Sequence, residues 1–144
     1  EVRMKRFLEM RGADGGPWRR LCALPAFWVG LMYDDGALDA AWDLVKSWTA
    51  AEVTALRRDV PRTALNARLR HYRLRDVAVE VLAIRREGLR ARRCLNRRGD
   101  DEGCFLETLM EIAESGRTPA EELLDAYATR WRQRVEPVFS EYNY

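Results

Sequence analysis

The side chains best suited to chemistry lie in the first residues of the chain, where charged and apolar residues alternate. Residues 2–11 read Val-Arg-Met-Lys-Arg-Phe-Leu-Glu-Met-Arg, and this period of two predicts a strand with unlike faces. Arg3, Lys5, Glu9 and Arg11 share one face. A carboxylate oxygen suits Mg²⁺, and an arginine fork suits phosphate or carboxylate oxygens. This face therefore predicts a site for polyphosphate and a divalent metal, unless it is the solvated side of an ordinary amphipathic strand.

The residues after this strand extend the same prediction. The run Gly12-Ala13-Asp14-Gly15-Gly16 predicts a turn, because glycine adopts backbone conformations that other residues avoid. Pro17 then suits the first turn of a helix. The unpaired amides at a helix start attract anions, so the turn would present a second phosphate-binding element beside the strand.

From Pro17 onward the pattern of apolar residues is helical. A first helix is expected over about 17–33, apolar almost all round and therefore buried, with a kink at Pro25. Residues 61–72 and 97–103 are expected to be loops. Further helices are expected over 37–48, from Thr49 to a point before Pro61, over 73–93, 104–115 and 118–132, with a short turn or helical stub at 135–139.

Two capping boxes define helix starts in this order. Thr49 with Glu52, and Thr118 with Glu121, have the spacing at which each side chain satisfies the free amide of the other residue. Gly116 is expected to end the helix before the second box.

The predicted fold class is mostly α, with one N-terminal β-strand followed by about six helices. We expect a single unit over 1–144, in which 1–14 form an active-site strand and turn and 15–144 a helical region. A lone buried strand would leave backbone groups unpaired, at roughly 1–3 kcal/mol each. We therefore expect it to pair with a segment outside these residues, and the opening Glu1-Val2-Arg3, without a Met, fits a fragment.

Composition excludes several classes of protein. With 47% hydrophobic and 33% charged residues and a net charge of +2, the chain fits a globular domain rather than a disordered or fibrous one. No apolar run reaches the ~18 residues of a membrane helix, so no membrane partner is expected. Cys22, Cys94 and Cys104 lack metal-ligand spacing and are expected to be reduced. His71 has no evident catalytic partners.

The arginine-rich stretch 62–98 raises the possibility of nucleic-acid binding. It lacks interleaved aromatic residues and any known binding motif, which favours a solvated helix face. No nucleic-acid partner is expected.

Residues 1–34 closely resemble a segment of plant and proteobacterial glutamate-cysteine ligases, most clearly in Phe-Leu-Glu-Met-Arg-Gly-Ala-Asp-Gly-Gly-Pro-Trp-Arg-Arg-Leu from position 7. Ser-Gly-Arg-Thr-Pro-Ala-Glu-Glu-Leu-Leu at 115–124 and Glu-Pro-Val-Phe at 136–139 resemble the carboxyl end of the same family. The resemblance thus covers most of the chain in the right order.

This resemblance implies a fold related to glutamine synthetase, with an antiparallel sheet that cups ATP, Mg²⁺ and glutamate. Glu9, Arg11 and Asp14 match the family's Glu-x-Arg-x-x-Asp strand pattern. The resemblance implies that Glu9 binds Mg²⁺ and that Arg11 is catalytic, binding ATP phosphate or the acyl phosphate. It implies that Arg3 and Lys5 are further ligands of ATP or substrate. The implied substrates are glutamate, cysteine and ATP.

The resemblance also sets expectations for the setting of the chain. The partner would be a catalytic region outside these residues, without which the chain is expected to be inactive. The location would be the cytoplasm of a bacterium or the plastid of a plant. Plant members are redox-regulated through disulfides, although a structural thiol is favoured for Cys22. The alternative function is a non-catalytic helical module that binds a partner.

Two segments depart from the family pattern. Residues 127–132 read Tyr-Ala-Thr-Arg-Trp-Arg, where the family tends to have Tyr-x-Gly-Glu-Trp-Gly, and 63–70 lack an expected Thr-Pro-Phe element. These changes predict altered contacts in the C-terminal segment.

Overall fold

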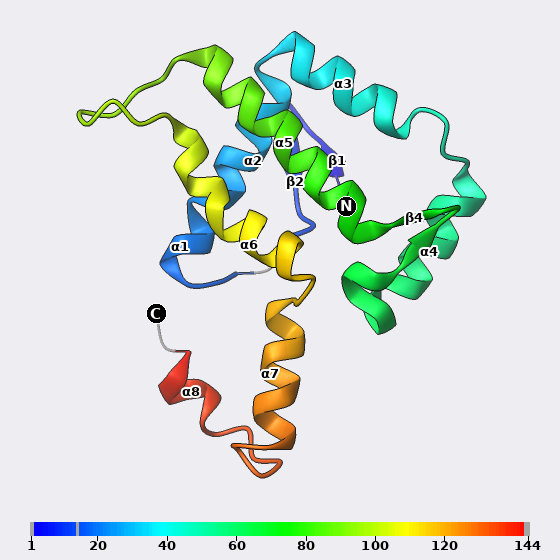
Figure 1. Ribbon diagram of the computed structural model, residues 1–144, viewed down its shortest axis with the longest axis vertical. Helices are drawn as coiled ribbons and strands as arrows, with labels where there is room; N and C mark the ends of the chain where they lie inside the picture. Colours follow the sequence, from blue (N-terminus) through cyan, green and yellow to red (C-terminus); the bar gives the residue numbers. More distant parts are fainter. Residues whose placement is uncertain (1, 14, 143–144) are drawn as a thin grey trace.

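The computed structural model describes residues 2–13 and 15–142, which are mostly helical with a few short strands (Figure 1). This confirms the predicted fold class. The strands are β1 Val2–Met4, β2 Leu8–Met10, β3 Arg68–Leu69 and β4 Tyr72–Arg73. The α-helices are α1 Trp18–Leu21, α2 Ala23–Met32, α3 Asp35–Val45, α4 Ala50–Thr63, α5 Leu74–Arg92, α6 Glu107–Ser115, α7 Pro119–Ala128 and α8 Val138–Glu141, with 3₁₀ turns η1 Ala64–Asn66 and η2 Glu102–Leu106.

Helix α5 is the centre of the fold and packs against α2, α3, α6 and η2 (Figure 1). Its buried positions include Val77, Leu82 and Leu89. The core joins these helices through a cluster of small and aliphatic side chains: Ala26, Leu82, Leu89, Leu106 and Ala113. Helix α7 extends away from this core, and the chain then turns so that α8 lies beside it (Figure 1).

Helices α2 and α5 cross in direct backbone contact. A Cβ atom on Gly88 would lie 2.0 Å from the carbonyl oxygen of Gly30 and 2.9 Å from the Cβ atom of Ala37. A Cβ atom on Gly30 would lie 2.4 Å from the carbonyl oxygen of Arg85. Only glycine fits at these two positions, because each of these three distances is shorter than a van der Waals contact.

The same crossing buries a cation. Arg85 is 5% exposed, and its guanidinium carbon lies 3.0 Å from the ring centre of Phe27. Its Nη1 donates a hydrogen bond to the carbonyl oxygen of Phe27 at 2.5 Å. Burial lowers the pKa of Arg85 to about 9, so the group is still charged at neutral pH. The aromatic face and the carbonyl thus offset part of the cost of removing the charge from water.

The N-terminal segment differs from the single strand predicted over residues 2–11. It folds back on itself, so that β1 and β2 form an antiparallel pair with Val2 opposite Met10, Arg3 opposite Glu9 and Met4 opposite Leu8. We expected this segment to pair with residues outside the chain, and this is wrong for the edges at which β1 and β2 pair with each other. Alternation of side chains cannot distinguish one strand from two strands joined by a short bend, because each keeps the period of two.

The first predicted helix is divided into α1 and α2 at Cys22, three residues before Pro25. Pro25 has no N–H to bond to the carbonyl oxygen of Leu21, four residues earlier, so the break lies where a proline disrupts a helix. The helix is also less buried than predicted: Ala23, Ala26 and Gly30 are buried, whereas Trp18 is 77% exposed and Tyr33 71%.

The two capping boxes and the end of α6 are confirmed. The Thr49 and Thr118 side chains each accept from the backbone N–H three residues on, and Glu52 and Glu121 bond back. Gly116 ends α6 with φ 71°. Helix α7, however, ends at Ala128 rather than near residue 132. The backbone has positive φ at Arg132 and Gln133.

Residues 61–72 are more ordered than the predicted loop. Helix α4 continues through Pro61 to Thr63, and η1 and the β3–β4 hairpin follow. Arg70, at the hairpin turn with φ 55°, donates from Nε and Nη2 to the two oxygens of Glu52 at 2.6 and 2.9 Å. It also bonds the Ser47 carbonyl oxygen at 2.6 Å. This arginine ties the hairpin to the start of α4, a contact that local patterns do not encode.

The helix crossing gives a stability prediction. Gly88→Ala forces the α2 and α5 backbones apart and is expected to lower the free energy of unfolding by about 1–3 kcal/mol or more. Gly15→Ala is the matched control, because a Cβ atom there has no neighbour within 4 Å, and is expected to change stability by less than about 0.5 kcal/mol. Urea unfolding followed by circular dichroism measures both. Equal effects of the two substitutions would contradict the backbone contact.

The Arg70 contact gives a prediction about pH. Hydrogen bonds from Arg70, then from the backbone and hydroxyl of Thr49, lower the pKa of Glu52 from 4.5 to about 2. Stability from this charge is present above pH 4.5 and is lost as pH falls toward 2. In Arg70→Met the pKa should rise toward 4.5 but stay below it, because Thr49 still donates. Carboxyl ¹³C NMR titration reads the pKa directly, and an unchanged value in Arg70→Met would refute the assignment.

Candidate functional site

The hairpin brings three of the predicted site residues together. Arg3 and Glu9 are directly opposite each other in the antiparallel pair, so their side chains share a face. Lys5, in the bend, places its Nζ atom 3.3 Å from Oε2 of Glu9 and 5.9 Å from the ring centre of Phe7. The predicted clustering of charge therefore occurs, although a hairpin rather than one extended strand produces it.

Glu9 has an incompletely satisfied carboxylate. Its Oε2 atom is shielded from solvent and accepts no hydrogen bond among the described residues, and the contact with Lys5 is an ion pair only. Lys5 supplies one positive charge to this oxygen but no hydrogen bond, so the carboxylate keeps acceptor capacity for a further ligand. The group fits Mg²⁺, which proteins hold through one or two carboxylates together with water and substrate phosphates.

Arg11 is one residue beyond β2 and is exposed. Asp14, the third residue of the predicted motif, lies outside the described residues. Within 2–13 and 15–142, no group of three or more His, Cys, Asp or Glu side chains is arranged to hold a metal. The described residues thus offer single carboxylates and arginines rather than a group of three metal ligands.

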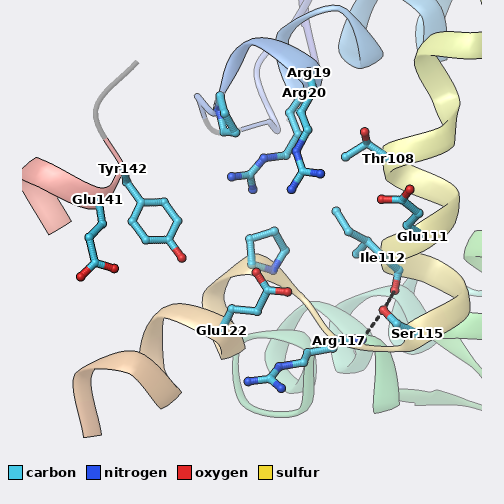
Figure 2. Close-up of a pocket in the computed structure, with 12 residues that line it drawn as sticks. Arg19, Arg20, Thr108, Glu111, Ile112, Ser115, Arg117, Glu122, Glu141 and Tyr142 are labelled. Carbon is cyan, nitrogen blue, oxygen red and sulfur yellow. Dashed lines mark hydrogen bonds between the residues drawn. The ribbon is translucent and has the colours of Figure 1, made fainter. Parts of the chain in front are cut away.

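A second polar site lies where α1, α6, α7 and α8 meet (Figure 2). It is a cleft of about 430 Å³, a volume within the usual ~300–1,000 Å³ range of small-molecule sites. Arg19 and Arg20 extend into it from α1, Glu111 from α6 and Glu122 from α7, and the Tyr142 ring closes one side (Figure 2). The cleft therefore has two cations facing two carboxylates across open space.

Close packing positions one of these arginines. Gly16 is buried, and a Cβ atom on it would lie 3.2 Å from Nε of Arg20. This Nε atom is itself shielded from solvent and has no hydrogen-bond partner among the described residues. The side chain of Arg20 is thus held against the backbone of the glycine turn.

Other charges at this cleft are already engaged. Arg117 pairs with Asp125. Glu141 pairs with Arg130 and accepts from Nε1 of Trp131 at 2.8 Å, and Figure 2 shows its carboxylate turned away from the centre of the cleft. Trp131 is buried and meets Tyr142 edge to face. These contacts hold α8 against the end of α7 and so fix the wall that carries Tyr142.

Local sequence patterns do not predict this cleft. Arg19 and Arg20 lie in the last turn of the short helix α1, where basic residues are ordinary, so their position is no sign of a role. Glu111 and Glu122 look like ordinary exposed helix residues. Their approach to the arginines depends on the packing of α6 and α7, which spacing along the chain does not reveal.

An apolar cavity of about 510 Å³ lies among α2, α5 and α6, next to the core. Its walls include Phe27, Val81 and Leu109, and Ala13, Gly15 and Arg20 line it as well. Arg20 is therefore shared between the apolar cavity and the polar cleft.

The three cysteines are free thiols, Cys22 half-buried and Cys94 and Cys104 exposed. The structure shows no disulfide among them. None of the helices in 2–13 and 15–142 is long and apolar enough to span a membrane.

Comparison with known proteins gives one consistent result. A sequence profile of glutamate-cysteine ligase family 2 matches residues 1–141. The whole chain is 54% identical to the chloroplastic glutamate-cysteine ligase of Arabidopsis thaliana and covers 26% of that protein. It is 50% identical to the chloroplastic enzyme of Solanum lycopersicum, again covering 26%, and 51% identical to chloroplastic ligase A of Oryza sativa subsp. indica, covering 28%.

The chain thus spans about a quarter of the length of the curated relatives that it matches. The profile match extends over nearly all of its residues, from the charged hairpin to the helix that closes the cleft. The chain belongs to glutamate-cysteine ligase family 2.

Proposed function

We propose that this chain is part of an ATP-dependent ligase that joins glutamate to cysteine, and that its N-terminal hairpin lies at the nucleotide site. The observation that carries the proposal is the solvent-shielded carboxylate oxygen of Glu9, which is ion-paired with Lys5 but accepts no hydrogen bond among the described residues, in a chain 54% identical to a plant glutamate-cysteine ligase. In the proposed reaction ATP phosphorylates the side-chain carboxylate of glutamate, and the cysteine amine then displaces phosphate to give γ-glutamylcysteine.

The proposed roles follow from the chemistry of each side chain. Glu9 would hold Mg²⁺, which neutralises charge on the transferring phosphoryl group when bound. Arg11 would bind ATP phosphate or the acyl phosphate through its guanidinium fork. Arg3 and Lys5 would add positive charge beside it. Preorganised charge of this kind is the main catalytic contribution in phosphoryl transfer.

The surface of the N-terminal part supports a further point, that the chain works together with more protein. Large apolar side chains are exposed along β1, β2, α1, α2 and α3, and extended exposed apolar surface indicates a protein contact. They include Val2, Met4, Phe7, Leu8, Trp18, Leu21, Tyr33, Leu38 and Trp42. We propose that this surface packs on the remaining catalytic region, and that the chain by itself does not turn over. The setting would be a plastid in a plant or the cytoplasm in a bacterium.

The same exposed surface favours a second candidate, a non-catalytic helical module that binds another protein. The two candidates differ in one respect. A module has no use for a solvent-shielded carboxylate beside arginine and lysine on the hairpin, whereas the ligase would use it to hold a metal ion.

The test is to replace the matching segment of the Arabidopsis thaliana ligase by this chain and to measure γ-glutamylcysteine formation. The chimera is expected to be active. Glu9→Gln and Arg11→Met should each lower kcat by about 10²-fold or more, because each removes a group that stabilises transition-state charge. Glu9→Gln should also raise the Mg²⁺ concentration needed for half-maximal rate.

Arg57→Met is the control, since Arg57 is an exposed residue of α4, and its rate is expected within a factor of about 2 of the unsubstituted chimera. An inactive but folded chimera would favour the non-catalytic module. Turnover by the 144-residue chain alone would contradict the need for a further region, and a wild-type rate in Glu9→Gln would remove Glu9 from the reaction.

A further inference from the structure

The polar cleft of Figure 2 has an arrangement of charge that points to its own ligand. Arg19 and Arg20 approach from α1, and the carboxylates of Glu111 and Glu122 face the same space from α6 and α7 (Figure 2). Within the part of the chain that the structure describes, no ion pair within 4.0 Å joins these arginines to these glutamates. Opposite charges that face each other without meeting leave room for a ligand that carries both.

The acidic side of the cleft suits an ammonium group, because Glu111 and Glu122 supply carboxylate acceptors from two helices. An ammonium group needs only a few acceptors, because it has three hydrogen-bond donors. The basic side suits a carboxylate, which a guanidinium fork holds in two hydrogen bonds.

A polyphosphate is disfavoured in this cleft. Its charges all have one sign, so the two arginines that attract it would be opposed by two glutamates on the facing walls. A ligand with separated charges of both signs meets no such repulsion.

The charged side chains stand on three different helices, and this placement favours a peptide over a free amino acid as the ligand. A free amino acid carries both charges on one carbon, which would have to satisfy walls formed by α1, α6 and α7 at once. Each additional residue moves the ends apart by up to about 3.8 Å. Ile112, Pro17 and Pro119 also line the cleft, and they would face the uncharged middle of such a ligand.

We propose that the cleft binds a short peptide with both ends free, its carboxylate at Arg19 and Arg20 and its ammonium at Glu111 and Glu122. The Tyr142 hydroxyl, which points into the cleft from α8 (Figure 2), is placed to donate to or accept from the peptide backbone. This site does not depend on the ligase reaction, because the charges that form it lie on described elements of this chain.

The test is titration of the full chain with L-Ala-L-Ala by calorimetry, without nucleotide or metal. Three probes serve as comparisons: N-acetyl-L-Ala-L-Ala lacks the ammonium, L-Ala-L-Ala amide lacks the carboxylate, and L-alanine has both charges on one carbon. The dipeptide is expected to bind at least ~10-fold more tightly than each of the three, since each comparison loses a charged contact or cannot make both. Equal or tighter binding of any of them, or no binding of the dipeptide, overturns the proposal.

Substitutions assign the two ends of the ligand. Glu122→Gln should weaken the dipeptide at least ~10-fold but leave N-acetyl-L-Ala-L-Ala unchanged, because that probe has no ammonium to lose. Arg20→Met should weaken the dipeptide similarly and leave the amide unchanged. Arg57→Met, on α4, should change nothing.

A misfolded variant would weaken every probe alike, so the selective pattern separates a binding role from a structural one. Glu122→Gln is nearly isosteric at an exposed position, so it carries the test even if Arg20→Met does not fold. Uniform loss across all probes in folded Glu122→Gln would overturn the assignment of the ammonium end.

Discussion

The contact between the α2 and α5 backbones at Gly30 and Gly88 determines much of this structure. No side chain fits between the helices there, so their separation and crossing point are fixed by the backbone itself. The crossing places Arg85 over Phe27 and sets the direction in which α1 enters α2. Since α6 also packs on α5, the positions of α1 and α6 relative to each other follow from the same contact. The polar cleft, which lies between α1 and α6, therefore depends on two glycines that do not line it.

Arginine side chains on the surface and in the interior of this fold are stabilised by different partners. On the surface, Arg70 and Glu52 are partly exposed, and their bond joins two pieces of local structure at little desolvation cost. In the interior, Arg85 has no carboxylate partner among the described residues and relies on an aromatic face and a carbonyl oxygen. A cation buried in this way lowers the stability of the fold. We infer that a fixed geometry is more important at this crossing than maximal burial of apolar surface.

Local sequence rules were sufficient for part of the fold and insufficient for the rest. Both capping boxes, the extent of α5 and the end of α6 at Gly116 follow from interactions within a few residues, and each was predicted. The β1–β2 hairpin was not, because alternation does not reveal where a strand reverses. The cleft was not, because it joins residues far apart in the chain. The charged face with Glu9 was predicted from spacing, while the roles of Glu9 and Arg11 came from the family resemblance and stay predictions.

Arg20 belongs to the walls of two neighbouring cavities, one polar and one apolar. Its aliphatic stem and its guanidinium thus form the boundary between an apolar space beside Phe27 and a charged one beside Glu111. One substitution at this position would change the walls of both spaces at once.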